Sequence, residues 1–350
     1  MEKDIFAMFG LTSKQSSILF SLESLLVLED ITKTNNIENA SMKRKWLAEW
    51  KASLKKVIVN DAEKRILSLD LGNLISEVKE ELSQSNDKTW YHLTLLEAVA
   101  FEAYTPLGNT AADKKYSRLK YKQPLEYIKK FAYSAGFTSP ELVARLDSAY
   151  KRAQDLAHGK IQKNIIKALA IVAAAAVVAA SAGALAGPIA VALFGSQFAG
   201  LGGAALVSAC LAFAGGGALA VGGAGMAGGV MAIVGGGALL GMAGAGAGVG
   251  LYSAVAKASP EFAISQGAKL NVVLSEIILN SQRDIQCAQA ILEKYKDQIS
   301  EMHKEISRMN LEREKDKRVI DSMKKTVDAL ERLYKDAIRF ASSFETGSEI

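Results

Sequence analysis

Charge is missing from the middle of this chain. Charged residues make up 23% of the sequence, yet no Asp, Glu, Lys, Arg or His lies between Ala168 and Ala256. A hydrocarbon core about 30 Å thick is crossed by roughly 20 helical residues, so an uncharged run of roughly 90 residues is long enough for up to four crossings. The run is too long for an ordinary core helix. It predicts a membrane-inserting region.

Cysteines and catalytic motifs are also scarce. Cys210 and Cys287 provide neither a disulfide framework nor the spacing of metal ligands. Three scattered histidines and the lack of HExxH, GxSxG and GxxxxGK[ST] motifs exclude the common metal, nucleophile and phosphate sites. A GxGxxG match beginning at Gly223 follows no predicted strand. We therefore expect no catalytic residues, no metal, no cofactor and no enzymatic activity.

A secretory signal is not recognisable either. The first residues, MEKDIFAMFG, include acidic side chains and lack a long apolar stretch and a small-residue cleavage site. We expect the chain to be made in the cytosol and to associate with a membrane, either the inner membrane or that of a target cell. The formal net charge of +5 suits a protein that meets anionic lipid.

The uncharged run is rich in Ala and Gly, and it contains most of the 29 glycines of the chain. Such segments insert weakly, because Leu, Ile, Phe and Val favour the bilayer by only about 0.3 to 0.6 kcal/mol each and Gly adds no side chain. Small residues four apart let helices pack closely. Such pairs are Gly183/Gly187, Gly225/Gly229, Gly237/Gly241, Gly244/Gly248 and Gly246/Gly250. We predict that these glycines pack the inserted helices, although so many glycines also produce the spacing by chance.

The ends of the run suggest its topology. Ile165 to Ala186 is the clearest helix, and Gly187-Pro188 is a natural break because proline cannot continue the hydrogen-bond ladder. Positive side chains flank the run on both sides: Lys160, Lys163 and Lys167 before it, and Lys257 and Lys269 after it. The positive-inside tendency then places both ends in the cytoplasm, which requires two or four crossings.

Composition divides the chain into three regions of an all-α protein. Residues 1–160 are predicted to form a helical N-terminal domain, 161–258 the Gly/Ala-rich membrane-inserting region, and 259–350 a long heptad region. In the first region, apolar residues recur at helical spacing over 16–28, 40–59, 71–82 and 90–103. A further helix begins at Thr138-Ser139-Pro140-Glu141, and its pattern allows it to extend past Gly159.

The third region carries a heptad pattern that is typical of a coiled coil or long helical bundle. Two apolar columns meet in a seam whose central residues are Leu292, Ile299, Met302, Ile306 and Met309. The pattern breaks only at Arg313 and Asp316, where either one helix carries a polar layer or two antiparallel helices meet. Because neither Pro nor Gly lies nearby, we favour one continuous or slightly bent helix. The seam is predicted to join subunits of a homo-oligomer or a related partner subunit, or to pack within the chain.

A basic segment lies in the N-terminal region, between Asp113 and Lys130. It interleaves tyrosines with cations that suit anionic headgroups, where each lysine contributes about 1 kcal/mol. The cations are Lys114, Lys115, Arg118, Lys120 and Lys122, and the tyrosines are Tyr116, Tyr121 and Tyr127. A solvated helix face is the simplest interpretation; contact with lipid or a partner is the functional one. Nucleic acid would use the same residues but is the least favoured.

The order of these regions resembles that of the α-helical pore-forming toxins of the cytolysin A and xenorhabdolysin type. The resemblance covers the architecture of 168–344 and rests on no diagnostic motif. It implies long helices that form a rod and an apolar part held as a hairpin until it enters a membrane. The Gly/Ala-rich segment followed by a coiled coil is also similar, more weakly, to apolipoprotein L.

These observations favour a membrane-permeabilising protein, a toxin or a cell-killing defence effector, that inserts its Gly/Ala-rich helices and oligomerises. The competing hypothesis is a resident inner-membrane tether whose coiled coil recruits a partner without forming a pore.

Overall fold

The computed structural model describes residues 11–57, 61–105, 110–136, 138–159, 260–309 and 314–346. All regular structure in these residues is helical, which confirms the all-α fold class. The uncharged run between Ala168 and Ala256 lies outside the described residues. Among the helices within them, none is both long and apolar enough to cross a membrane.

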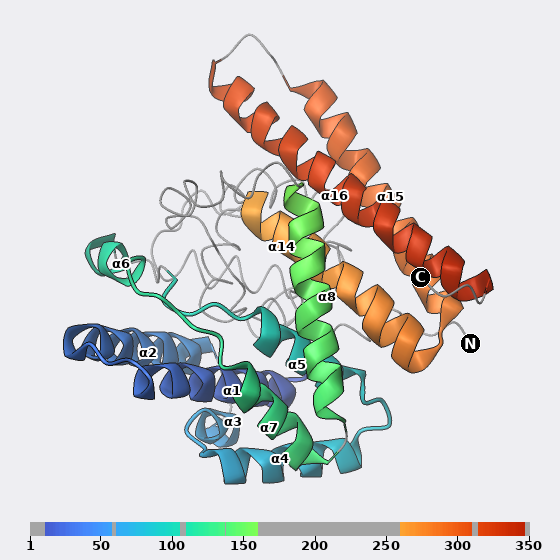
Figure 1. Ribbon diagram of the computed structural model, residues 1–350. Coiled ribbons are helices and arrows are strands. Elements are labelled where there is room, and N and C mark those ends of the chain that lie inside the picture. Colours follow the sequence, from blue (N-terminus) through green and yellow to red (C-terminus); the bar gives the residue numbers. More distant parts are fainter. Residues whose placement is uncertain are drawn as a thin grey trace.

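The N-terminal region is a cluster of short helices around α1 (Figure 1). They are α1 (Ser13–Thr32), α2 (Ile37–Val57), α3 (Asp61–Ile66), α4 (Leu71–Gln84), α5 (Thr89–Ala100), α6 (Thr110–Tyr116), α7 (Leu125–Ala135) and α8 (Pro140–His158). Helix α5 is buried on nearly every side, as its apolar sequence requires, and α1 and α8 pack against it. The helices predicted over 16–28, 40–59, 71–82, 90–103 and from 138 onward are confirmed, except that α5 ends at Ala100 and residues 58 and 59 lie outside the described residues.

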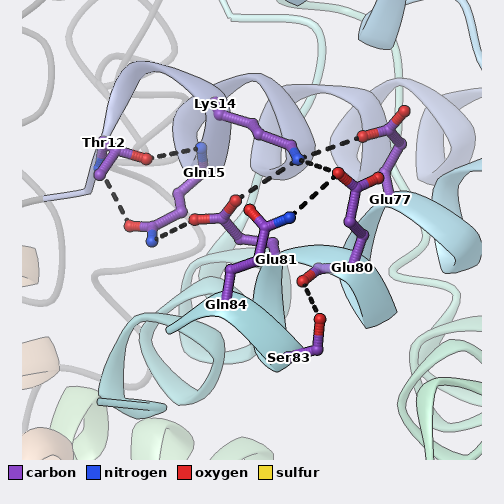
Figure 2. A network of polar contacts seen from close by, with 8 residues as sticks. All are labelled: Thr12, Lys14, Gln15, Glu77, Glu80, Glu81, Ser83 and Gln84. Atoms are coloured by element: carbon purple, nitrogen blue, oxygen red, sulfur yellow. Dashed lines mark hydrogen bonds and ion pairs between the residues drawn. The ribbon is translucent and has the colours of Figure 1, made fainter. Parts of the chain in front are cut away.

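Polar contacts fix the start of α1 against α4 (Figure 2). Thr12 and Gln15 form a capping box, and the Gln15 side chain also donates to Glu81 at 2.9 Å. Lys14 lies 3.5 to 3.7 Å from the carboxylates of Glu77, Glu80 and Glu81. Burial acts to lower the pKa of Lys14, but the three carboxylates outweigh it and raise that pKa. The first turn of α1 is therefore attached to one face of α4.

The C-terminal region consists of α14 (Pro260–Val272), the π-helix η6 (Val273–Gln282), α15 (Ile285–Arg308) and α16 (Glu314–Thr346). Helices α15 and α16 form a hairpin that projects from the rest of the molecule (Figure 1). They are antiparallel, because Gln289 bonds Glu345 near one end and His303 bonds Glu331 further along.

The expectation of one continuous heptad helix is therefore wrong. Helix α15 ends at Arg308, and Met309 is extended, with φ −72° and ψ 139°. The physical reason lies in the seam: Arg313 and Asp316 offer no apolar side chain to continue it. Folding back lets the apolar columns on either side of this break bury each other.

The N-terminal and C-terminal regions share one hydrophobic core. Buried side chains from α1 to α16 form a single contiguous cluster. Helix α8 connects the two regions, since it packs against α5 and α7 on one side and against α14 and α16 on the other.

Candidate functional site at the ends of the apolar run

The two helices that flank the apolar run lie side by side and run in opposite directions. Tyr150 of α8 is hydrogen-bonded to Ser265 of α14 at 3.0 Å. Earlier on α8, Arg145 forms an ion pair of 3.3 Å with Glu276 of η6. Since lower numbers on α8 pair with higher numbers on α14 and η6, the end of α8 and the start of α14 fall at the same end of the pair (Figure 1). The last described residues before the run and the first described residues after it therefore lie at the same end of this helix pair.

The end of α8 is fixed by a side chain from α16. The guanidinium of Arg332 donates to the carbonyl of Leu156 at 3.1 Å and to that of Ala157. These carbonyls belong to the last turn of α8, where a cation is favoured by the helix dipole. Gly159 follows with φ +70° and ψ 153°, a conformation that ends the helix. The helix therefore ends before Gly159, although its sequence pattern allowed it to extend further.

A buried ion pair connects the last turn of α14 to the central helix α5. Lys269 Nζ lies 2.6 Å from Glu97 Oε2, and the side chains are 0% and 1% exposed. Removing one member of such a pair leaves an uncompensated charge in the interior. Helix α14 is therefore held to α5 by an interaction that breaks only at a large free-energy cost.

Glu23 of α1 adds a second buried carboxyl to this cluster. In the described part of the chain its carboxyl oxygens have no hydrogen-bond partner. Burial, and then the charge of Glu97, raise the pKa of Glu23 well above its ordinary value, although Lys269 opposes the shift. With Glu23 protonated, the charges of Lys269 and Glu97 cancel and the cluster is neutral.

Helix α14 also approaches the C-terminal hairpin closely. A Cβ atom placed on Gly267 would lie 2.5 Å from Leu330 Cδ2, 3.1 Å from Leu333 Cδ1 and 3.2 Å from Tyr295 Oη. A larger residue here would force the Leu330 side chain of α16 to move, because it lies directly against the α14 backbone. Helix α14 thus packs against α8 and α16 and is joined to α5 by the Lys269–Glu97 pair.

The burial of Lys269 corrects one step of the sequence interpretation. Lys269 was counted with Lys257 as an exposed positive flank, but it lies in the core and forms an ion pair with Glu97. It therefore gives no support to the positive-inside argument. Lys257, with Lys160, Lys163 and Lys167, lies outside the described residues. The sequence does show Lys269 between the apolar residues Ala268 and Leu270, but it does not show its partner, Glu97, 172 residues away.

The five predicted lipid-contact cations lie on the surface, on α6 and in the loop that follows it. They are Lys114, Lys115, Arg118, Lys120 and Lys122, all exposed. The tyrosines between them are not at the surface as expected: Tyr116 is buried, and Tyr121 and Tyr127 are half-buried. Burial raises the pKa of Tyr121 well above its ordinary value. The tyrosines hold this segment to the core and leave the cations outside.

The apolar seam packs within the chain. Ile299 and Met302 are buried, and Leu292, Ile306 and Met309 are half-buried against the same core. In the described residues α16 is the partner of this face of α15. A role of these residues in joining subunits remains a prediction.

The remaining predicted residues cannot be placed. Gly183, Gly187, Gly225, Gly229, Gly237, Gly241, Gly244 and Gly248 lie outside the described residues. No group of His, Cys, Asp and Glu that could hold a metal ion occurs in the described ranges.

Comparison of the chain with protein-family models, curated proteins and solved structures finds no match. The functional argument therefore rests on the residues and their geometry.

Proposed function

We propose that this protein permeabilises a lipid membrane by inserting the uncharged run between Ala168 and Ala256. The observation that carries the proposal is that run itself, which is long enough for several crossings and has no charged side chain to prevent them. The small-residue pairs within it supply the close packing that inserted helices need.

The flanking helices support an even number of crossings. Helices α8 and α14 are antiparallel neighbours, so a segment that leaves at His158 and returns at Pro260 starts and ends on one side. A hairpin or a pair of hairpins satisfies this condition, and three crossings do not. The helical body then stays on the side from which insertion begins, and the Lys269–Glu97 pair keeps α14 attached to it.

We also propose that several copies of the protein assemble around the membrane pore that their inserted runs form. The C-terminal hairpin projects from the body and its apolar seam is engaged within the chain, so the proposed contacts between copies use other surfaces. The competing function is a resident membrane tether, which would use the same run as an anchor and the hairpin to bind a partner, without a pore.

Release of a fluorescent dye from liposomes tests the proposal. The purified full chain is expected to release the dye, whereas Ala176→Asp places a charge in the middle of the clearest apolar helix. Such a charge costs roughly 2.5 to 3.5 kcal/mol of insertion free energy, so this variant should release much less. Ala62→Asp, at an exposed position of α3 away from both the run and the basic segment, adds the same charge and is the matched control.

Three results would contradict the proposal. No release by the wild type, with the protein still bound to the vesicles, would favour the tether. Equal release by Ala176→Asp and the wild type would show that this helix does not cross lipid. Release lost equally in the control would show that added charge, and not insertion, decides the result.

A further inference from the structure

Helix α2 carries a row of cations on its exposed side. Arg44, Lys51 and Lys55 follow one another at intervals of seven and four residues, which places them on one face of a helix. Arg44 and Lys55 are exposed and Lys51 is half-buried, while Trp46 and Trp50 on the opposite face are in the core. Burial, and then the charge of Lys55, lower the pKa of Lys51, as expected where like charges crowd together.

The fold brings the basic segment of the sequence beside this row. Helix α6 packs against α2, and Tyr116 at the end of α6 donates a hydrogen bond of 2.8 Å to Glu49 of α2. Before α6, the carbonyl of Thr105 accepts a hydrogen bond of 2.7 Å from Trp46 Nε1 of α2. Segments 59 and 67 residues apart in the sequence therefore contact each other, and α2 and α6 lie together at the left of Figure 1.

A buried aspartate fixes the far end of the same segment. Asp30 Oδ1 accepts a hydrogen bond of 3.2 Å from the backbone of Lys122. Its other oxygen accepts from Lys43 Nζ and Tyr104 Oη, both at 2.6 Å. Thr105 and Lys122 are thus both held on the α1–α2 pair, and the cations of α6 and the following loop lie at the surface beside it.

These residues make up one cationic face. It consists of Arg44, Lys45, Lys51 and Lys55 of α2 with Lys114, Lys115, Arg118, Lys120 and Lys122 of α6 and the following loop. The acidic groups on these elements are Glu38, Glu49 and Asp113. Glu49 accepts a hydrogen bond from Tyr116 and lies 3.9 Å from Lys45. Because the cations outnumber these three carboxylates, the face is strongly positive.

An exposed aliphatic side chain lies in the same row. Ile37 is 85% exposed and precedes Arg44 by seven residues, as Arg44 precedes Lys51, so the three share one helix face. The cations favour an anionic leaflet, and an exposed aliphatic side chain among them gains free energy by leaving water. Single-stranded nucleic acid would instead require exposed aromatic rings for stacking, and here Trp46, Trp50 and Tyr116 are buried.

We infer that the cationic face of α2 and α6 docks on an anionic lipid leaflet, with Ile37 entering the headgroup region. This inference rests on the proposed function, because it supplies the step that brings the apolar run to its membrane. Each cation near an anionic surface adds attraction that salt screens. Docking is therefore expected to be selective for anionic vesicles and to weaken as the salt concentration rises.

Vesicle flotation of the full chain tests the inference. The vesicles are phosphatidylcholine alone or phosphatidylcholine mixed with phosphatidylglycerol. Neutralising the row with Arg44→Gln, Lys51→Gln and Lys55→Gln should weaken binding to the anionic vesicles roughly hundredfold. Ile37→Ser should weaken it roughly tenfold. The matched control is Lys324→Gln, Lys325→Gln and Lys335→Gln on the exposed side of α16, which should bind like the wild type. Circular dichroism checks that each variant is folded.

The outcomes separate this inference from the proposed function. Equal binding by the α2 variant and the α16 control, with dye release intact, would overturn the inference alone. Binding through the cationic face without dye release would support the inference and overturn permeabilisation. A wild type that binds neither kind of vesicle would overturn both. Loss of duplex DNA retention in the α2 variant, with vesicle binding unchanged, would assign the face to nucleic acid instead.

Discussion

The carboxyl group of Glu23 is buried beside Glu97 and Lys269 and has a raised pKa. A carboxyl with a raised folded-state pKa contributes stability that is fully present below its unfolded pKa and is lost as the pH rises through the folded value. Glu23→Gln should remove this dependence. Relative to the wild type, the variant should gain up to about 1.4 kcal/mol of unfolding free energy for each pH unit above the unfolded pKa, until the folded pKa is passed.

Thermal unfolding of both proteins between pH 4 and pH 8 measures the effect, in mild detergent if the chain requires it. The difference in midpoint should widen as the pH rises above the unfolded pKa. Parallel curves over this range would show that Glu23 titrates normally and that the cluster is not held neutral in the way described.

A second prediction at the level of single residues concerns the buried Lys269–Glu97 ion pair. Lys269→Met leaves Glu97 and Glu23 without their cation, and loss of one partner of a buried pair costs about 3 to 5 kcal/mol. Adding Glu97→Gln to this variant should recover much of the loss, because the remaining groups are then uncharged. Denaturant unfolding measures both. A single variant as stable as the wild type would contradict the buried pair.

At the scale of elements, the contact between α14 and α16 depends on Gly267. Gly267→Ala should destabilise the protein by about 1 to 3 kcal/mol through overpacking against Leu330, less the gain in helix propensity. Gly72→Ala in α4 is the matched control, because its Cβ would lie 3.5 Å from the nearest atom, Asp70 Oδ1. The control should be neutral or stabilising in the same unfolding experiment. A stable Gly267→Ala variant would mean that the two helices are further apart.

The hairpin of α15 and α16 predicts how the apolar seam responds to charge. Ile299→Asp with Ile306→Asp introduces two carboxylates into a face that packs on α16. Helicity and solubility should fall together, since unpaired buried charges destabilise the fold itself. Circular dichroism and light scattering measure the two quantities. A folded variant that only changes from oligomer to monomer would show that the seam joins subunits.

The sequence predicted individual helices better than it predicted their pairing. Apolar periodicity located α1, α2, α4, α5 and α8, because local spacing determines which face can be buried. The same heptad columns fit one long helix or two antiparallel ones, so Arg313 and Asp316 could not decide between them. The burial of Lys269 was beyond local patterns as well, since it depends on Glu97 and Glu23 from distant helices. The sequence also identified the surface cations of α6 and the following loop, but it did not show that the cations of α2 lie beside them.

For the whole molecule, the fold places three features in a consistent arrangement. Helices α8 and α14, which precede and follow the apolar run, pack together, the cationic face lies on α2 and α6, and the hairpin of α15 and α16 packs against α8 and α14 (Figure 1). In our account the cationic face docks on lipid, the run inserts, and the helical body remains outside the bilayer. The central claim is that the run inserts into the bilayer.

The most direct test uses Cys210, which lies within the run, after Cys287 has been replaced by alanine. An environment-sensitive fluorophore on Cys210 should shift its emission to the blue when anionic vesicles are added. It should then be quenched by nitroxide groups in the acyl chains and protected from iodide in the water. A label that stays accessible to iodide and is not quenched by the nitroxides, on protein that is bound to the vesicles, would contradict insertion of the run.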